Sequence, residues 1–183
     1  NSEDEVIEIN GYNYDSVDRA TLSITTGENV INIYYAKRTD LSYKVNYLEK
    51  TTNKVLNTQK IVNSVTFEDI INVSDEVITI DGYNYDLADK DTLTITIEEN
   101  VINLYYTKRT DLSYTVNYLE KGTGKVLNIA KTVDGQEFKK EITENAIDIV
   151  GYNLDGTAER KITIGVTGNV INFYYTKKTD LQY

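Results

Sequence analysis

The stretch Asn29-Val-Ile-Asn-Ile-Tyr-Tyr35 decides the fold, because it occurs three times. It returns as Asn100-Val-Ile-Asn-Leu-Tyr-Tyr106 and as Asn169-Val-Ile-Asn-Phe-Tyr-Tyr175, at offsets of 71 and 69 residues. Self-similarity at a fixed period is the signature of a repeat architecture. The 183-residue chain is therefore expected to be a tandem array of one module of roughly seventy residues.

Other motifs keep the same offsets and divide the chain. They are Gly11-Tyr-Asn-Tyr14, Gly82-Tyr-Asn-Tyr85 and Gly151-Tyr-Asn-Leu154, together with Arg38-Thr-Asp-Leu41, Arg109-Thr-Asp-Leu112 and Lys178-Thr-Asp-Leu181. We expect residues 1–42 to be the second half of a repeat, and residues 43–112 and 113–183 to be complete repeats. A periodic sequence cannot fix its own phase, so a differently phased unit stays open.

Each repeat predicts several strands. Alternation in Tyr114 to Tyr118, a turn at Lys121-Gly-Thr-Gly124 and a return at Lys125-Val-Leu127 indicate a hairpin. Glu68 to Ile80 is compatible with a short helix or an irregular crossover. Gly82-Tyr-Asn-Tyr85 is interpreted as a turn. With about four strands and one crossover per unit, the expected class is α+β to mostly β.

The strand that contains the repeated stretch has two different faces. Ile102, Leu104 and Tyr106 lie on one side, where only apolar residues replace one another between copies, so this side is assigned to the core. Asn103 and Tyr105 lie on the other side, which keeps Asn and Tyr in every copy and is assigned to a partly solvated surface.

Composition narrows the function. His, Cys, Trp, Met and Pro are absent, so nucleophile–base pairs, common zinc sites and disulfides are out of reach, and no cofactor is expected. Only a carboxylate-pair enzyme stays formally possible, and we expect a non-enzymatic protein. The net charge of −10 argues against nucleic acid or anionic membranes as partners. No apolar run approaches the roughly 18 residues of a membrane span, so no membrane insertion is expected.

The order of these motifs resembles the mucin-binding-protein (MucBP-type) repeats of Gram-positive surface adhesins. The order is Tyr-x-Val-x-Tyr-Leu-Glu-Lys, a turn with Lys-Val-Leu, Gly-Tyr, and a closing Val-Ile-x-x-Tyr-Tyr. It is found in residues 43–56, 82–83 and 101–106, and again in residues 114–127, 151–152 and 170–175. The resemblance implies ubiquitin-like β-grasp modules on a wall-anchored, extracellular protein at the bacterial cell surface. It also implies adhesion to mucin or another host glycoprotein, but no fixed set of ligand residues.

The Asn–Tyr face is the candidate glycan site. A tyrosine ring can stack on a sugar while a neighbouring amide bonds its hydroxyl groups. If the first and last strands of a module are neighbours, Asn117 extends the surface beside Asn172 and Tyr174. Ordinary cross-strand pairing on a wet sheet face is the competing interpretation. The candidate residues are Asn32, Tyr34, Asn103, Tyr105, Asn117, Asn172 and Tyr174.

A calcium site and a Lys–Asn cross-link are two further possibilities, and each has a plainer interpretation. The acids of Asp15-Ser-Val-Asp18 and Asp86-Leu-Ala-Asp89, with Asp91, could hold calcium, but solvated loop acids are the better interpretation. A Lys–Asn cross-link at Asn46 or Asn117 needs a buried lysine, and solvated lysines are far commoner. No metal site is therefore predicted.

Two functions remain in competition. One is weak, multivalent binding to glycans of mucin or a host glycoprotein. The other is a passive stalk that holds another domain away from the cell wall. The evidence for a stalk is the Lys-Arg-Thr-Asp-Leu-Ser sequence at the junctions between repeats. These junctions have no Gly or Pro and predict a stiff, elongated rod. The half-repeat at residues 1–42 would expose a strand edge, through which the chain could self-associate.

Overall fold

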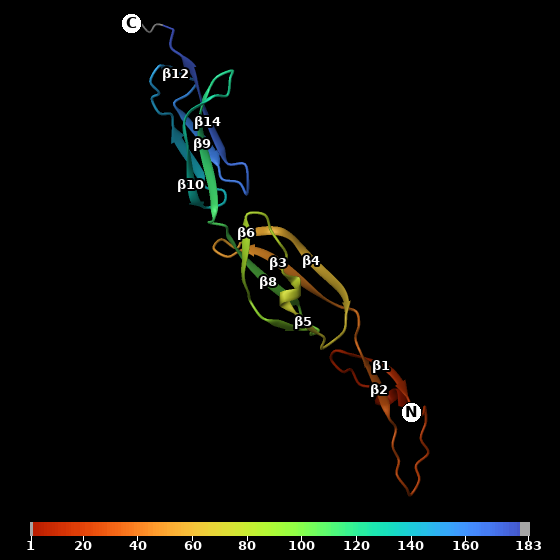
Figure 1. Cartoon of the computed structure of the whole chain (residues 1–183). Helices are drawn as coiled ribbons and strands as arrows, with labels where there is room; N and C mark the ends of the chain where they lie inside the picture. Colours follow the sequence, from red (N-terminus) through yellow and green to blue (C-terminus); the bar gives the residue numbers. More distant parts are fainter. Residues whose placement is uncertain (1, 180–183) are drawn as a thin grey trace. The chain divides into compact units, whose positions relative to one another are not determined.

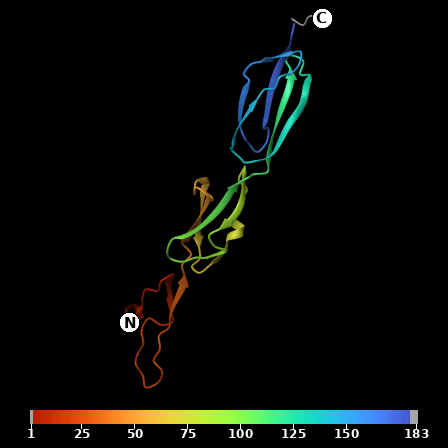
Figure 2. The same ribbon diagram turned by 90° about the vertical axis from the view of Figure 1, so that its left-hand side faces the viewer.

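The computed structural model describes residues 2–179, and it is mostly β. The leading half-repeat contains a short 3-10 helix (Ser2–Glu5) and the antiparallel pair β1 (Tyr12–Val17) and β2 (Ile33–Lys37). Residues 18–32 between the two strands form an irregular loop that extends beyond the pair (Figure 1, Figure 2).

The middle module begins at β3 (Leu41–Glu49) and ends at β8 (Asn100–Lys108). Between them lie β4 (Val55–Val65), β5 (Ile70–Asn72), a 3-10 helix (Val73–Glu76), β6 (Tyr83–Ala88) and β7 (Thr92–Thr94). Four of the strands form a sheet in the order β4-β3-β8-β6, and β5 pairs with β7 in a separate ribbon. The crossover is therefore a strand followed by a single 3-10 turn.

The third module repeats this plan. Its strands are β9 (Leu112–Glu120), β10 (Val126–Gln136), β11 (Glu141–Asn145), β12 (Tyr152–Asp155), β13 (Glu159–Thr163) and β14 (Val170–Lys177). The sheet order is β10-β9-β14-β12, and β11 pairs with β13. In both modules the first and last strands are parallel neighbours, as β9 and β14 show (Figure 1).

The core of each module lies between its four-stranded sheet and its two-stranded ribbon. In the third module, buried side chains of β9 and β14 pack with Ile142 of the ribbon and with Ile164 beside it. Period-two alternation produces this layer, because every second side chain of a strand faces the same way. Ile102 and Leu104 are 0% exposed and Tyr106 is 1% exposed, so the predicted core face is confirmed.

The hairpin prediction is confirmed, and its turn explains one substitution. β9 and β10 pair antiparallel around residues 121–125, as β3 and β4 do in the middle module. Gly124 has φ +72°, and its counterpart Asn53 has φ +55°. Both residues occupy the left-handed region, where asparagine is the best tolerated residue after glycine.

Two details of the predicted unit were wrong. Each module has six strands rather than about four, because the crossover contains a short strand, β5 in the middle module, and the segment interpreted as a turn begins another, β6. The segment Gly82-Tyr-Asn-Tyr85 is not a turn as a whole: Gly82 turns the chain at φ +79°, and β6 starts directly at Tyr83. Asn84 and Asp86 have a low β propensity, which masked the extended character of this strand.

The chain divides into two compact units, residues 1–78 with 85–106, and residues 79–84 with 107–183. The division into residues 1–42, 43–112 and 113–183 stays a prediction. Within the part of the chain that the structure describes, no helix is long and apolar enough to cross a membrane.

Candidate functional site

The Asn–Tyr face lies on the last strand of each repeat, as expected. In β8 the side chains of Asn103 and Tyr105 are half-buried, between fully buried neighbours on the opposite face. Asn172 and Tyr174 have the same exposure in β14. In the leading half-repeat Asn32 and Tyr34 are exposed, and Tyr34 keeps 51% of its surface. The predicted partly solvated face is therefore observed in both complete modules.

An asparagine pair spans the two central strands of each complete module. The parallel register places Asn46 opposite Asn103 and Asn117 opposite Asn172. The Nδ2 atom of Asn46 donates to Oδ1 of Asn103 at 2.8 Å, and Asn117 donates to Asn172 in the same way at 2.9 Å. The expectation that Asn117 lies beside Asn172 is confirmed, because the first and last strands are neighbours.

Each amide nitrogen and each amide oxygen of the pair in the middle module already has a side-chain partner. Asn103 Nδ2 donates to Asp89 at 3.0 Å, and Asn46 Oδ1 accepts from Gln59 at 2.6 Å. The leading half-repeat repeats the first contact, since Asn32 Nδ2 donates to Asp18 at 3.0 Å. These asparagines hold neighbouring segments together and have little capacity left for a ligand.

The third module keeps the asparagine pair without these partners. Ala158 stands where the middle module has Asp89, and Ala130 stands where it has Gln59. The bond of the pair uses Nδ2 of Asn117 and Oδ1 of Asn172. Within residues 2–179, Nδ2 of Asn172 and Oδ1 of Asn117 have no side-chain hydrogen-bond partner. One amide donor and one amide acceptor are thus open to a ligand on a half-buried surface. The sequence shows both alanine substitutions, but their effect on the asparagine pair becomes visible only when the hydrogen-bond partners are known.

A shallow pocket of about 400 Å³ adjoins this open amide in the third module. Asn172, Tyr174, Arg160 and Lys161 are among its lining residues. The guanidinium of Arg160 lies 5.9 Å from the ring centre of Phe173, and its buried Nε has no hydrogen-bond partner in the described part of the chain. Arg160 was missed by the sequence reasoning. Its signal was available, because Arg160 stands where the earlier copies have Asp91 and Ala20.

The acids considered for calcium have other partners. Asp86 pairs with Lys50 at 2.5 Å, and Asp89 holds Asn103. The backbone N–H of Asn32 is the main cause that lowers the pKa of Asp18. No group of three or more metal-ligating side chains lies within residues 2–179. Asn46 and Asn117, the candidates for a cross-link, donate instead to Asn103 and Asn172 in the asparagine pairs.

A tyrosine–glutamate–lysine cluster, with a buried tyrosine and a half-exposed lysine, lies at the edge of the core in both complete modules. The Tyr43 hydroxyl donates to Glu76 at 2.7 Å, and Lys60 pairs with the same carboxylate at 2.5 Å. Tyr114 and Glu144 repeat the pair in the third module, although Glu76 belongs to a 3-10 helix and Glu144 to β11. Burial, followed by the bond to the carboxylate, raises the pKa of Tyr43 and of Tyr114 to about 12.

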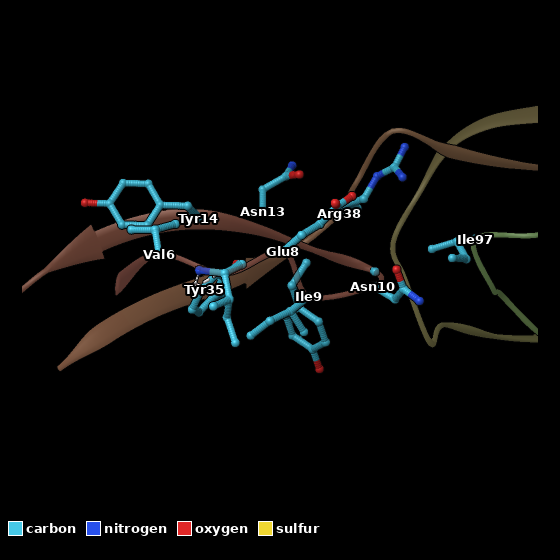
Figure 3. A pocket seen from close by; sticks show the side chains of 12 residues that line it. Val6, Glu8, Ile9, Asn10, Asn13, Tyr14, Tyr35, Arg38 and Ile97 are labelled. Atoms are coloured by element: carbon cyan, nitrogen blue, oxygen red, sulfur yellow. Dashed lines mark hydrogen bonds between the residues drawn. The ribbon is translucent and has the colours of Figure 1, made fainter. Parts of the chain in front are cut away.

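A second pocket, of about 460 Å³, is lined by the leading half-repeat together with Ile97 of the middle module (Figure 3). Apolar and aromatic side chains line much of it, including Val6, Ile9 and Tyr14. The Tyr35 hydroxyl donates to the carbonyl of Ile7 at 2.9 Å and accepts from its N–H at 3.0 Å. β2 has no parallel neighbour comparable to β3 or β9 among the described strands, so this side of the strand pair is open.

Comparisons with known proteins find similarity to repeats of bacterial surface proteins. No family model and no curated protein matches the chain. Among solved structures, the type 2 repeat of the mucus binding protein MUB from Lactobacillus reuteri matches at 14% identity and a TM-score of 0.28, over 75% of this chain and 99% of that one. The crystal structure of Mub-RV matches at 12% identity and a TM-score of 0.28, over 75% and 98%.

Streptococcal High Identity Repeats in Tandem (SHIRT) domains 3–4 from a cell surface protein also match, at 12% identity and a TM-score of 0.30, over 73% of this chain and 96% of that one. These TM-scores are below 0.5, so the overlaps carry no weight for the fold or ligand of this chain. The chain is similar, at this low level, to two repeats of mucus-binding type and to tandem repeats of a streptococcal cell surface protein.

Proposed function

We propose that this chain is a non-enzymatic repeat segment of an extracellular bacterial surface adhesin that binds glycans of mucin or a host glycoprotein. The modules are proposed to be ubiquitin-like β-grasp units. The parallel pairing of first and last strands at the centre of each sheet supports this proposal. The motif order supports the placement at the cell surface.

One observation carries the binding proposal: the third module has an open amide pair beside a tyrosine and a cationic pocket. Asn172 offers a donor and Asn117 an acceptor, which suit the hydroxyl groups of a sugar. The Tyr174 ring supplies an apolar face for stacking. Glu159 also lines the pocket and pairs with Lys161 at 3.5 Å, so Arg160 is the cation that favours a glycan with an acidic group. Binding through one small surface is weak, and copy number would strengthen it.

The test compares two matched double variants on a glycan array and on immobilised mucin. Asn172→Ala with Tyr174→Ala is expected to reduce binding by at least about tenfold, equivalent to about 1.4 kcal/mol. Asn103→Ala with Tyr105→Ala is the control, and it should leave binding unchanged because its amides are already occupied. An equal loss of glycan binding in both variants would show that the Asn–Tyr face of each copy binds, and not that of the third module alone. Replacement of Tyr34, Tyr105 and Tyr174 together then measures the whole face.

A stalk is the second candidate, and the junctions favour it. Three residues, 109–111, separate β8 from β9. Arg109 binds Asp111 through two hydrogen bonds of 2.9 Å, and Arg38 binds Asp40 in the same way at the preceding junction. The bonds to these arginines are the main cause that lowers the pKa of Asp40 and Asp111. Planar two-point pairs of this kind restrict both side chains and the short segment between them.

Small-angle scattering tests the stalk. An elongated particle with one well-defined length is expected, whereas a freely jointed particle would contradict the stiff rod. If the wild-type chain binds no glycan and no mucin, the adhesive proposal fails and the stalk is left as the function. The two roles are compatible when binding and an elongated particle are both observed.

A further inference from the structure

A phenylalanine packs on a glycine at two equivalent places in the chain. In the first unit, Phe67 lies against Gly11 so closely that a Cβ atom on the glycine would be 2.4 Å from Cε1 of the ring. In the second unit, Phe138 lies against Gly82, where the corresponding distance is 2.3 Å. Real Cβ atoms do not come this close, so both contacts require glycine.

Two more contacts accompany each phenylalanine. The tyrosine that follows the glycine meets the ring edge-on, with centroids 5.6 Å apart for Tyr12 with Phe67 and for Tyr83 with Phe138. The N–H of Phe67 donates to the carbonyl of Arg38 at 2.8 Å, and that of Phe138 donates to the carbonyl of Arg109 at 2.9 Å.

The arginine is itself bound to the glycine. Its N–H donates to the glycine carbonyl at 2.9 Å in both places. A lysine completes each contact: Lys37 pairs with Glu68 at 2.9 Å, and Lys108 pairs with Glu137 at 3.0 Å. The same receptor, made of glycine, tyrosine, an arginine carbonyl and a lysine, therefore holds a phenylalanine-tipped turn twice.

In the third copy the glycine, the tyrosine and the carbonyl are in place, but no phenylalanine of the described residues lies against them, and the equivalent Lys177 pairs with Glu120 at 3.4 Å. Gly151 has φ +80°, against +83° for Gly11 and +79° for Gly82, and the N–H of Lys178 donates to its carbonyl at 2.9 Å. A Cβ atom on Gly151 would meet no atom within 4 Å in the described residues. Tyr152 is half-buried where Tyr83 is only 8% exposed, and the adjoining Val150 is 100% exposed.

We propose that Gly151, Tyr152 and the carbonyl of Lys178 form a docking site for the phenylalanine-tipped turn of a further copy of this module, joined directly after this junction. The two occupied receptors identify the occupant. Each receives its ring from the turn that follows the first hairpin of the next module, at the end of β4 or β10. The site is a recurrent lock between consecutive modules, and it does not depend on glycan binding.

The test uses an extended chain in which Leu181 is followed by a second copy of residues 113–179. Nuclear magnetic resonance then follows the Gly151 amide and the Tyr152 ring. Both are expected to shift relative to the 183-residue chain and to approach the Gly82 and Tyr83 signals. Replacing the added copy's counterpart of Phe138 by alanine should return them to their original positions, while the other signals show that the added copy is folded.

A second variant guards against misfolding of the added copy. Gly151→Ala changes no residue of the added copy. It should lower the melting temperature of the extended chain more than that of the original chain. The difference should be similar to the difference between Gly82→Ala and Gly151→Ala in the original chain. Unshifted Gly151 and Tyr152 signals in a folded extended chain would overturn the proposal. An equal loss from Gly151→Ala in both chains would overturn it as well.

Discussion

Alanine at Gly82 and alanine at Gly151 form a matched pair that measures the phenylalanine contact in the chain as it stands. The two glycines have φ angles of +79° and +80°, so alanine pays the same left-handed backbone cost of about 1–2 kcal/mol at each position. Only at Gly82 does the new methyl group also meet a ring, at 2.3 Å from Phe138 Cε1.

The additional cost at Gly82 follows from overpacking. Displacing a ring to make room for a methyl group typically costs about 1–3 kcal/mol, and the edge-to-face contact with Tyr83 contributes about 0.5–1.5 kcal/mol that would be lost with it. In a unit of this size, 1 kcal/mol changes the melting temperature by about 4–8 °C. Gly82→Ala should therefore melt at least about 4 °C below Gly151→Ala.

Two measurements check this prediction. Circular dichroism gives the melting temperatures, and hydrogen exchange follows the Phe138 amide, which donates to the Arg109 carbonyl. Exchange of this amide should accelerate by roughly five-fold or more in Gly82→Ala and stay unchanged in Gly151→Ala. Equal melting temperatures and equal exchange would refute the reasoning, because the backbone term alone would then explain both variants.

Three further predictions concern the cores, the amide pairs and the leading half-repeat. The pKa of Tyr43 and Tyr114 is raised to about 12 from an ordinary value of 10, so their contribution is fully present below pH 10 and is lost as the pH rises towards 12. Urea unfolding should lose about 2–3 kcal/mol per tyrosine over this window, and the loss should shrink in Tyr43→Phe; an unchanged loss would contradict the assignment. Asp89→Ala should free the amide of Asn103 and add mucin binding to the middle module, at a cost in stability of about 1 kcal/mol; unchanged binding by a folded variant would show that an open amide is not sufficient. A peptide of residues 41–65, which contains the β3–β4 hairpin, should pair with the open side of β2 and slow hydrogen exchange in the leading half-repeat, whereas a scrambled peptide should not; equal effects of both peptides would argue against strand pairing.

Local patterns in the sequence predicted much of the fold. The alternation in residues 100–106 identified the core face, because side-chain direction along a strand depends only on position. The hairpin turn at Asn53 and Gly124 was also predictable from the sequence, because the left-handed backbone conformation restricts the residue type at that position. The crossover was less accessible: a three-residue strand such as Ile70–Asn72 has too few positions to show a period.

The repeat, the strand faces and the Asn–Tyr surface were thus determined by the sequence alone, since each depends on spacing along one segment. Only the tertiary structure decided which amides are occupied and which glycine faces a ring. Asn103 and Asp89 are 14 residues apart, and Gly82 and Phe138 are 56 residues apart. Such contacts depend on how separate strands are brought together, so the same Gly-Tyr motif is covered at Gly82 and open at Gly151.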